Sequence, residues 1–170
     1  TLALLRQFPL QRLTAVDPIE LRRAMALRLG ADSAIFPDGE RPPVGWEAAD
    51  LAYEVSGSPA ALDTALTLTG FAGRVVIGSW YGQKQAPINL GGAFHRSRIR
   101  LIASQVSTID PQWSGRWDKG RRFTLAWQML QQLKLDSLVT HRYPIAEAAG
   151  AYQLIDEQNQ QTIQVILTYP

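Results

Sequence analysis

Short runs of apolar and β-branched residues alternate with helical runs through residues 1–105 of this chain. Pro18–Leu29 begins with proline, which fits the first turn of a helix, and is followed by Gly30, a residue that often terminates helices. Because parallel strands need a crossover connection, usually a helix, this alternation predicts an α/β fold with a doubly wound parallel sheet. The predicted strands are Leu13–Val16, Ser33–Phe36, Asp50–Val55, Arg74–Ile77 and Ile99–Ala103, the predicted helices are Pro18–Leu29, Pro59–Leu68 and Gly91–Ser97, and a turn is predicted at Pro37–Gly45.

The residues from Ser104 onward have a different character. Helical runs cover Phe123–Leu133 and Ile145–Asp156, an extended piece lies between them at Leu138–Tyr143, and Thr162–Tyr169 has the pattern of a final strand. This final strand has no obvious neighbour in the earlier sheet. We therefore expect it to pair with a strand outside that sheet, in a part of the protein that this chain lacks.

The composition excludes several classes of function. The chain has 170 residues, 46% of them hydrophobic, which suits one globular domain. Lys and Arg number 17 against 15 Asp and Glu, so we expect neither nucleic acid nor a membrane as a partner. The absence of cysteine excludes a thiol nucleophile or a cysteine zinc site within these residues, and two histidines cannot form a histidine-rich one. We therefore predict no metal-binding residue in the chain.

The first residues suggest that the sequence begins inside a structural element. Thr1 stands where Met would be expected, and Thr1–Phe8 has the pattern of a helix interior without an N-cap. The apolar stretch is too short to span a bilayer, and Arg6 interrupts the apolar region that a signal peptide would need. We therefore expect a fragment of a longer cytoplasmic protein whose upstream part carries some of the function.

Acidic and small residues follow the ends of the predicted strands. In an open parallel sheet, ligands bind at the carboxyl ends of the strands. Asp17 ends the first strand, and an Asp about 20 residues after a phosphate-binding turn accepts hydrogen bonds from the ribose hydroxyls of a dinucleotide. The chain has no Gly-x-Gly-x-x-Gly turn, which would then fall before residue 1. The alternative, that Asp17 is only a helix-capping or turn residue, stays open.

A set of segments carries a family resemblance: Ala15–Asp32, Asp50–Leu66, Gly73–Gly82, Ser137–Pro144 and the closing VILTYP. In content and order they resemble the medium-chain dehydrogenase/reductase family, and in particular its zinc-type alcohol dehydrogenase branch. Two further segments, Phe94–Ile109 and Ser114–Arg122, resemble a subgroup grouped with bacteriochlorophyllide-type dehydrogenases.

The resemblance implies a Rossmann-like cofactor-binding fold without its first strand and glycine turn. Residues 1–105 would be an incomplete dinucleotide-binding domain, and residues 106–170 would carry helices and a strand that belongs to the sheet of a missing catalytic domain. The missing strand would lie between the strands that end at Asp17 and Val55. Because two rows of backbone groups would then be unpaired, we expect the isolated chain to be marginally stable, to aggregate, or to close the gap by non-native strand pairing.

The resemblance also implies a set of cofactor-binding residues at or just after the strand ends. The adenosine side comprises Asp17, Pro18, Arg22, Ser56 and Gly57, and the nicotinamide side comprises Ile77, Gly78, Ser79, Ala103 and Gln105. Because a carboxylate at Asp17 would repel a 2′-phosphate, NAD(H) is favoured, whereas Arg22 and Arg23 keep NADP(H) open. The catalytic zinc and its ligands would lie on the missing domain.

The implied activity is hydride transfer between a nicotinamide and a small-molecule alcohol or carbonyl substrate, with this chain inactive alone. Two alternatives stay open, which are a non-catalytic dinucleotide-binding or assembly module and a zinc-free, NADPH-dependent enzyme similar to quinone reductases. The resemblance further implies a homodimer that forms through the strand near Arg98–Ala103.

Overall fold

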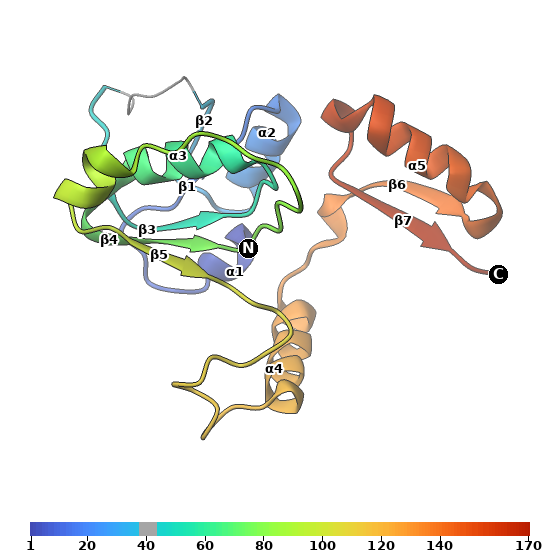
Figure 1. Ribbon diagram of the computed structural model, residues 1–170. Coiled ribbons are helices and arrows are strands. Elements are labelled where there is room, and N and C mark those ends of the chain that lie inside the picture. Colours follow the sequence, from blue (N-terminus) through green and yellow to red (C-terminus); the bar gives the residue numbers. More distant parts are fainter. Residues whose placement is uncertain (38–43) are drawn as a thin grey trace. The chain divides into compact units, whose positions relative to one another are not determined.

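The computed structural model describes residues 1–37 and 44–170 and confirms the predicted α/β class with parallel sheets (Figure 1). The helices and strands are α1 (Leu2–Leu5), β1 (Thr14–Val16), α2 (Glu20–Arg28), β2 (Ser33–Ile35), β3 (Ala49–Glu54), α3 (Pro59–Leu68), β4 (Thr69–Ile77), β5 (Arg100–Ala103), α4 (Lys119–Gln132), β6 (Val139–Pro144), α5 (Ala148–Glu157) and β7 (Gln164–Thr168). Short turns of π or 3-10 helix are η1 (Leu90–Phe94), η2 (Asp136–Leu138), η3 (Ile145–Glu147) and η4 (Asn159–Gln161). Most of the predicted turn at Pro37–Gly45 lies outside the described residues.

The chain forms two compact units. One contains Thr1–Pro37 together with Gly120–Pro170, and the other contains the described part of residues 38–119. These units follow spatial contacts, whereas the division at residue 105 follows the family resemblance and stays a prediction.

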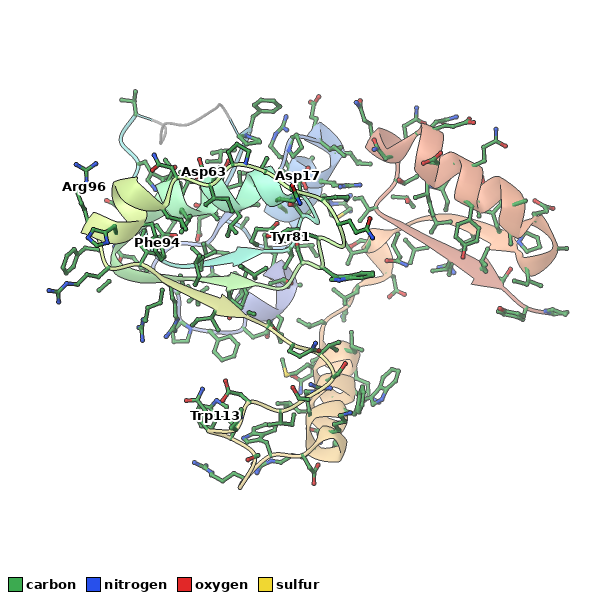
Figure 2. The ribbon with its side chains drawn as sticks, in the orientation of Figure 1. Asp17, Asp63, Tyr81, Phe94, Arg96 and Trp113 are labelled. Atoms are coloured by element: carbon green, nitrogen blue, oxygen red, sulfur yellow. The ribbon has the colours of Figure 1, made fainter. Side chains whose placement is uncertain are left out.

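The second unit is built on the three-stranded parallel sheet β3-β4-β5, with α3 against β3 and β4 (Figure 1). Leu62 and Leu66 stand four residues apart on α3, so both point to the same side and pack with Val75 and Ile99 in a buried core. Figure 2 shows Tyr81 and Phe94 at opposite ends of this sheet. The core therefore lies under α3, and Ile77 at the carboxyl end of β4 packs against it.

The first unit contains the parallel pairs β1-β2 and β6-β7, with α2 packed against the first pair and α5 against the second. β7 pairs in parallel with β6. That the final strand belongs to the sheet of a missing catalytic domain stays a prediction. The connection between β6 and β7 is η3, α5 and η4, which is the helical crossover that a parallel pair requires. The sequence pattern predicted the strand β7 but did not identify the strand that pairs with it.

The edges of the sheets agree with the expected gap in strand order. Among the described residues, β1 pairs only with β2, and β3 pairs only with β4. Each of these two strands therefore has one edge without a strand partner. A strand between the ends at Asp17 and Val55 stays a prediction.

Several element boundaries differ from the sequence prediction. The N-terminal helix is limited to Leu2–Leu5, because hydrogen bonds of Gln7 and Phe8 reach back only three residues and tighten the chain before Pro9. Strand β4 begins at Thr69 rather than Arg74, because Thr69 ends α3 in an extended conformation and pairs with Ala49. These boundaries depend on pairing and turn geometry that composition does not specify.

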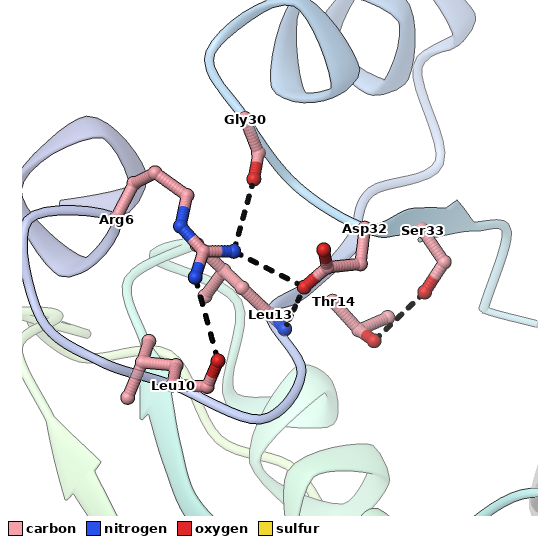
Figure 3. A network of polar contacts seen from close by, with 7 residues as sticks. All are labelled: Arg6, Leu10, Leu13, Thr14, Gly30, Asp32 and Ser33. Carbon is pink, nitrogen blue, oxygen red and sulfur yellow. Dashed lines mark hydrogen bonds and ion pairs between the residues drawn. The ribbon is translucent and has the colours of Figure 1, made fainter.

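A polar network around Arg6 fixes the chain just before β1 and β2 (Figure 3). The Arg6 guanidinium donates to the carbonyl oxygens of Leu10 (3.4 Å) and Gly30 (3.5 Å) and forms an ion pair with Asp32 at 3.2 Å. The same Asp32 oxygen, Oδ2, accepts a hydrogen bond from the backbone N–H of Leu13 at 2.6 Å. Gly30 has φ +97°, so this position favours glycine, as the predicted helix end requires.

We expect Asp32→Ala to lower the free energy of unfolding by about 1–2 kcal/mol, because the N–H of the buried Leu13 loses its acceptor. The Arg6 ion pair adds little, since both side chains are partly exposed. Urea unfolding measures the change, and Asp156→Ala on the exposed side of α5 is the control. A midpoint for Asp32→Ala equal to that of the control would contradict the role of the network.

Candidate functional site

The carboxyl ends of β3, β4 and β5 meet at one edge of their sheet. The register pairs Glu54 with Ile77 and Ile77 with Ala103, so the three strands end at the same level. Of the predicted cofactor-binding residues, this edge brings together those at or just after the strand ends, which are Ser56, Gly57, Ile77, Gly78, Ser79, Ala103 and Gln105. We call this set of residues, together with Glu54, the carboxyl edge.

Backbone hydrogen bonds continue across the carboxyl edge beyond the strands. The N–H of Gly78 donates to the carbonyl of Glu54, and the N–H of Ser104 donates to the carbonyl of Ile77, both at 2.8 Å. A Cβ added at Gly78 would lie 3.1 Å from Cγ1 of Val55. A side chain at Gly78 would crowd Val55, so glycine allows the segments that follow β3 and β4 to run close together.

The turn after β3 is fixed at Gly57. Its φ is +74°, a conformation that favours glycine. Its N–H donates to the hydroxyl of Ser79 at 2.8 Å, and its carbonyl accepts a hydrogen bond from Nζ of Lys84 at 3.1 Å. Two groups from the loop after β4 therefore hold the turn after β3.

Glu54 is a buried carboxylate at this edge that sequence reasoning missed. Its side chain is only 3% exposed, although it ends a strand whose neighbouring positions are largely apolar. Oε1 accepts hydrogen bonds from the N–H of Ser56 (2.7 Å) and its hydroxyl (2.5 Å), and Oε2 accepts one from the hydroxyl of Tyr81. The acidic residue within a largely apolar strand was the signal in the sequence that could have pointed to Glu54. Its partner Tyr81, however, lies 27 residues further along the chain, in the loop after β4.

These contacts shift both titrating groups away from their ordinary behaviour. Burial raises the pKa of the Glu54 carboxyl, but hydrogen bonds from Ser56, Tyr81 and Ser79 lower it by more, so the pKa lies below its ordinary value. Burial and the adjacent Glu54 carboxylate raise the pKa of the Tyr81 hydroxyl well above its ordinary value. At neutral pH, Tyr81 is therefore the donor and Glu54 the ionised acceptor.

The predicted adenosine-side residues Asp17, Pro18 and Arg22 lie in the other unit, at the end of β1 and the start of α2. Oδ1 of Asp17 accepts a hydrogen bond from the N–H of Ile19 at 2.8 Å, so Asp17 does act as a local turn residue. The Arg23 guanidinium donates to the Asp17 carbonyl at 2.8 Å, and the Arg22 guanidinium donates to the carbonyl of Asn159 at 3.4 Å. Binding of a ribose by Asp17 stays a prediction.

Gln105 lies just beyond β5 with an exposed side chain. Its Oε1 accepts a hydrogen bond from the N–H of Ser107 at 2.6 Å, so the side chain bends back toward its own loop. Binding of a ligand by the backbone of Gln105, which the resemblance implies, stays a prediction.

The described residues contain no group of three or more His, Cys, Asp or Glu side chains that could hold a metal ion. Nor does any helix in the described ranges combine the length and apolar character that crossing a membrane requires. The zinc that the resemblance implies does not fit the residues described here.

A sequence model of zinc-binding dehydrogenases matches residues 2–119. The chain belongs to this family. The predicted membership of the zinc-type branch of the medium-chain dehydrogenases is thereby confirmed. The narrower resemblance to bacteriochlorophyllide-type dehydrogenases stays a prediction.

The curated relatives include D-guloside 3-dehydrogenase of Escherichia coli K12 and the Shigella flexneri protein of the same name. Each is 27% identical over 164 residues, an alignment that covers 91% of this chain and 47% of the relative. The chain therefore spans about half the length of the curated relatives it matches.

Solved structures of this zinc-binding dehydrogenase fold are also similar. L-idonate 5-dehydrogenase from E. coli matches with a TM-score of 0.76 at 18% identity, covering 98% of this chain and 45% of that one. A short chain alcohol dehydrogenase from E. coli CFT073, complexed with NADH, matches with a TM-score of 0.74 at 19% identity, covering 98% and 48%. At these identities the likeness shows the fold, which confirms the Rossmann-like architecture.

The Glu54 contacts predict a specific pH dependence of stability. Because the pKa of Glu54 is lower in the folded chain than in the unfolded one, the carboxylate stabilises the fold above about pH 4.3, and this contribution is lost as the pH falls through the folded pKa. We expect the wild-type protein to be more stable than Glu54→Gln at pH 7, and the difference to shrink toward pH 3. Urea unfolding across this range measures it. A difference that stayed constant would show that the carboxylate charge contributes nothing.

Proposed function

We propose that this chain is the cofactor-binding part of an NAD(H)-dependent dehydrogenase that acts on a small-molecule alcohol or carbonyl compound. The observation that carries the proposal is the carboxyl edge, where three parallel strands end at the same level and small residues follow β3 and β4, in a chain of the zinc-binding dehydrogenase family. Open parallel sheets bind dinucleotides at this edge. The similar alcohol dehydrogenase complexed with NADH supports the choice of cofactor.

The residues of the carboxyl edge fit a flat cofactor. A Cβ added at Gly57 would meet nothing within 4 Å, so the space above this glycine is open, and Gly78 is exposed although its Cβ direction is taken by the side chain of Val55. Backbone groups of Ile77, Ala103 and Gln105 would hold the nicotinamide carboxamide. A bound nicotinamide supplies the hydride acceptor or donor, and the residues of this chain orient it.

Asp17 supports NAD(H) over NADP(H). Its carboxylate would accept hydrogen bonds from ribose hydroxyls and would repel a 2′-phosphate. Arg22 and Arg23 are the cations that could offset this repulsion, but Arg22 donates to Asn159, and Arg23 donates to the Asp17 carbonyl and lies 5.5 Å from the ring centre of Phe36. Both guanidinium groups thus have other partners.

The zinc of such an enzyme would lie on a part of the protein outside this chain, because the described residues offer no ligand cluster. Substrate choice would depend on that part as well. The chemistry assigned to this chain is therefore limited to binding and orienting the cofactor.

The test is made on the full-length protein. We expect it to bind NADH more tightly than NADPH, and we expect Asp17→Ala to raise the Kd for NADH about tenfold through loss of charge-assisted hydrogen bonds to the ribose. Fluorescence titration measures both, with Asp156→Ala as the control. Unchanged NADH affinity in Asp17→Ala would contradict the ribose assignment. NADH binding without turnover of any alcohol would favour the non-catalytic module, and preference for NADPH would favour the zinc-free reductase.

We also propose that the protein forms a homodimer through the strand near Arg98–Ala103. All four residues of β5 are exposed, and among the described residues β5 pairs only with β4. Its free edge can accept a strand from a second copy.

We expect the full-length protein to elute from size-exclusion chromatography as a dimer at low micromolar concentration. An edge-to-edge strand contact supports this, because unpaired backbone groups of β5 gain partners across the two-fold axis. Light scattering during elution gives the mass. A monomer mass at every concentration would contradict the contact.

A further inference from the structure

The loops that follow β3 and β4 are joined by one buried carboxylate. Glu54 is 3% exposed and has no cationic partner among its recorded contacts. Its two oxygens serve different loops, since Oε1 binds Ser56 just after β3 and Oε2 binds Tyr81 in the loop after β4. We call Glu54, Ser56 and Tyr81 the Glu54 clamp.

A carboxylate suits this position better than an amide. The side chain receives three donors, two from Ser56 and one from Tyr81, and an ionised carboxylate accepts on both oxygens. A glutamine would offer only one acceptor oxygen, and its amide would have to donate to the Tyr81 hydroxyl instead. Burial of the charge costs free energy that these hydrogen bonds offset.

A second set of contacts joins the same two loops. The Ser79 hydroxyl accepts from the N–H of Gly57, and Lys84 donates to the Gly57 carbonyl. The loop after β4 thus touches the turn after β3 at both ends, at Ser79 and at Lys84, with Tyr81 between them. Figure 2 shows Tyr81 at the carboxyl ends of the strands, where its hydroxyl reaches Glu54.

We propose that Glu54 is a positioning residue that holds the turn at Ser56–Ser58, on the predicted adenosine side, and the loop at Ser79–Lys84, on the predicted nicotinamide side, at the spacing needed to receive the cofactor. The inference rests on the proposed function, because it assigns the same edge to a dinucleotide. Glu54 itself lies beneath the edge and acts through Ser56 and Tyr81. Loss of the clamp would leave only the contacts of Ser79 and Lys84 with Gly57 to join the two loops, so their spacing would vary more while the β3-β4-β5 ladder stayed paired.

The test uses Tyr81→Phe, Glu54→Ala and Glu54→Gln in the full-length protein. We expect Tyr81→Phe to raise the Kd for NADH about fivefold and Glu54→Ala about tenfold or more, since one or several hydrogen bonds to a charged group are lost. Glu54→Gln restores most of the affinity, because it keeps an acceptor for Ser56. The KM for NAD should rise while kcat changes less than twofold, since the clamp positions the cofactor and does not touch the reacting atoms.

Hydrogen exchange without nucleotide provides a readout that does not depend on binding. We expect the amides of Ser56, Gly57 and Ser58 to exchange faster in Tyr81→Phe, with amides of β4 unchanged. The matched control is Tyr152→Phe, which removes a hydroxyl from a tyrosine that is 70% exposed on α5. If Glu54→Ala fails to fold, Tyr81→Phe still tests the positioning role, because this variant removes only one hydroxyl oxygen and should fold.

The outcomes separate the two proposals. Wild-type NADH binding with variant affinities within twofold of it would overturn the positioning role and leave the proposed function standing. Failure of the wild-type protein to bind NADH would overturn both, even if the exchange data showed the loops to be joined. Weaker NADH binding in Tyr81→Phe, with faster exchange at Ser56–Ser58 and recovery in Glu54→Gln, would support the clamp.

Discussion

The parallel register of β3, β4 and β5 is the constraint on which the candidate site depends. Because the strands run in the same direction and end together at Glu54, Ile77 and Ala103, the turns that follow them are neighbours. The buried packing of Leu66 on α3 against Val75 on β4 stabilises this register, since a slip of one residue would turn the apolar side chain of Val75 away from the helix. The register therefore positions the glycines and serines of the edge before any ligand arrives.

The buried charge of Glu54 links the shape of the edge to its protonation state. A carboxylate that is almost inaccessible to water is tolerated only where donors replace that water, and here Ser56 and Tyr81 supply them from two loops. The same hydrogen bonds lower the pKa of Glu54 and raise that of Tyr81, so the donor and acceptor roles stay fixed at neutral pH. The same carboxylate thus contributes to stability and contacts both loops.

Asp17 shows that a structural role and a binding role need not exclude each other. One of its carboxylate oxygens accepts from the N–H of Ile19 and holds the start of α2, as the simpler interpretation of the sequence expected. That contact orients the side chain at the end of β1, where a ribose would be bound in an open parallel sheet. The contacts of Arg22 and Arg23 with other groups then bear on which dinucleotide fits.

The sequence by itself determined the α/β class, the helix end at Gly30, the family and the small residues at the strand ends, because periodicity, turn chemistry and motifs are local properties of the chain. The pairing of β7 with β6 required the tertiary structure, since a strand pattern does not name its partner. The contact between Glu54 and Tyr81 did as well, because it joins residues 27 positions apart and exists only when β3 and β4 pair in this register. Long-range side-chain contacts follow from strand register and burial, and both depend on residues that are far apart in the sequence.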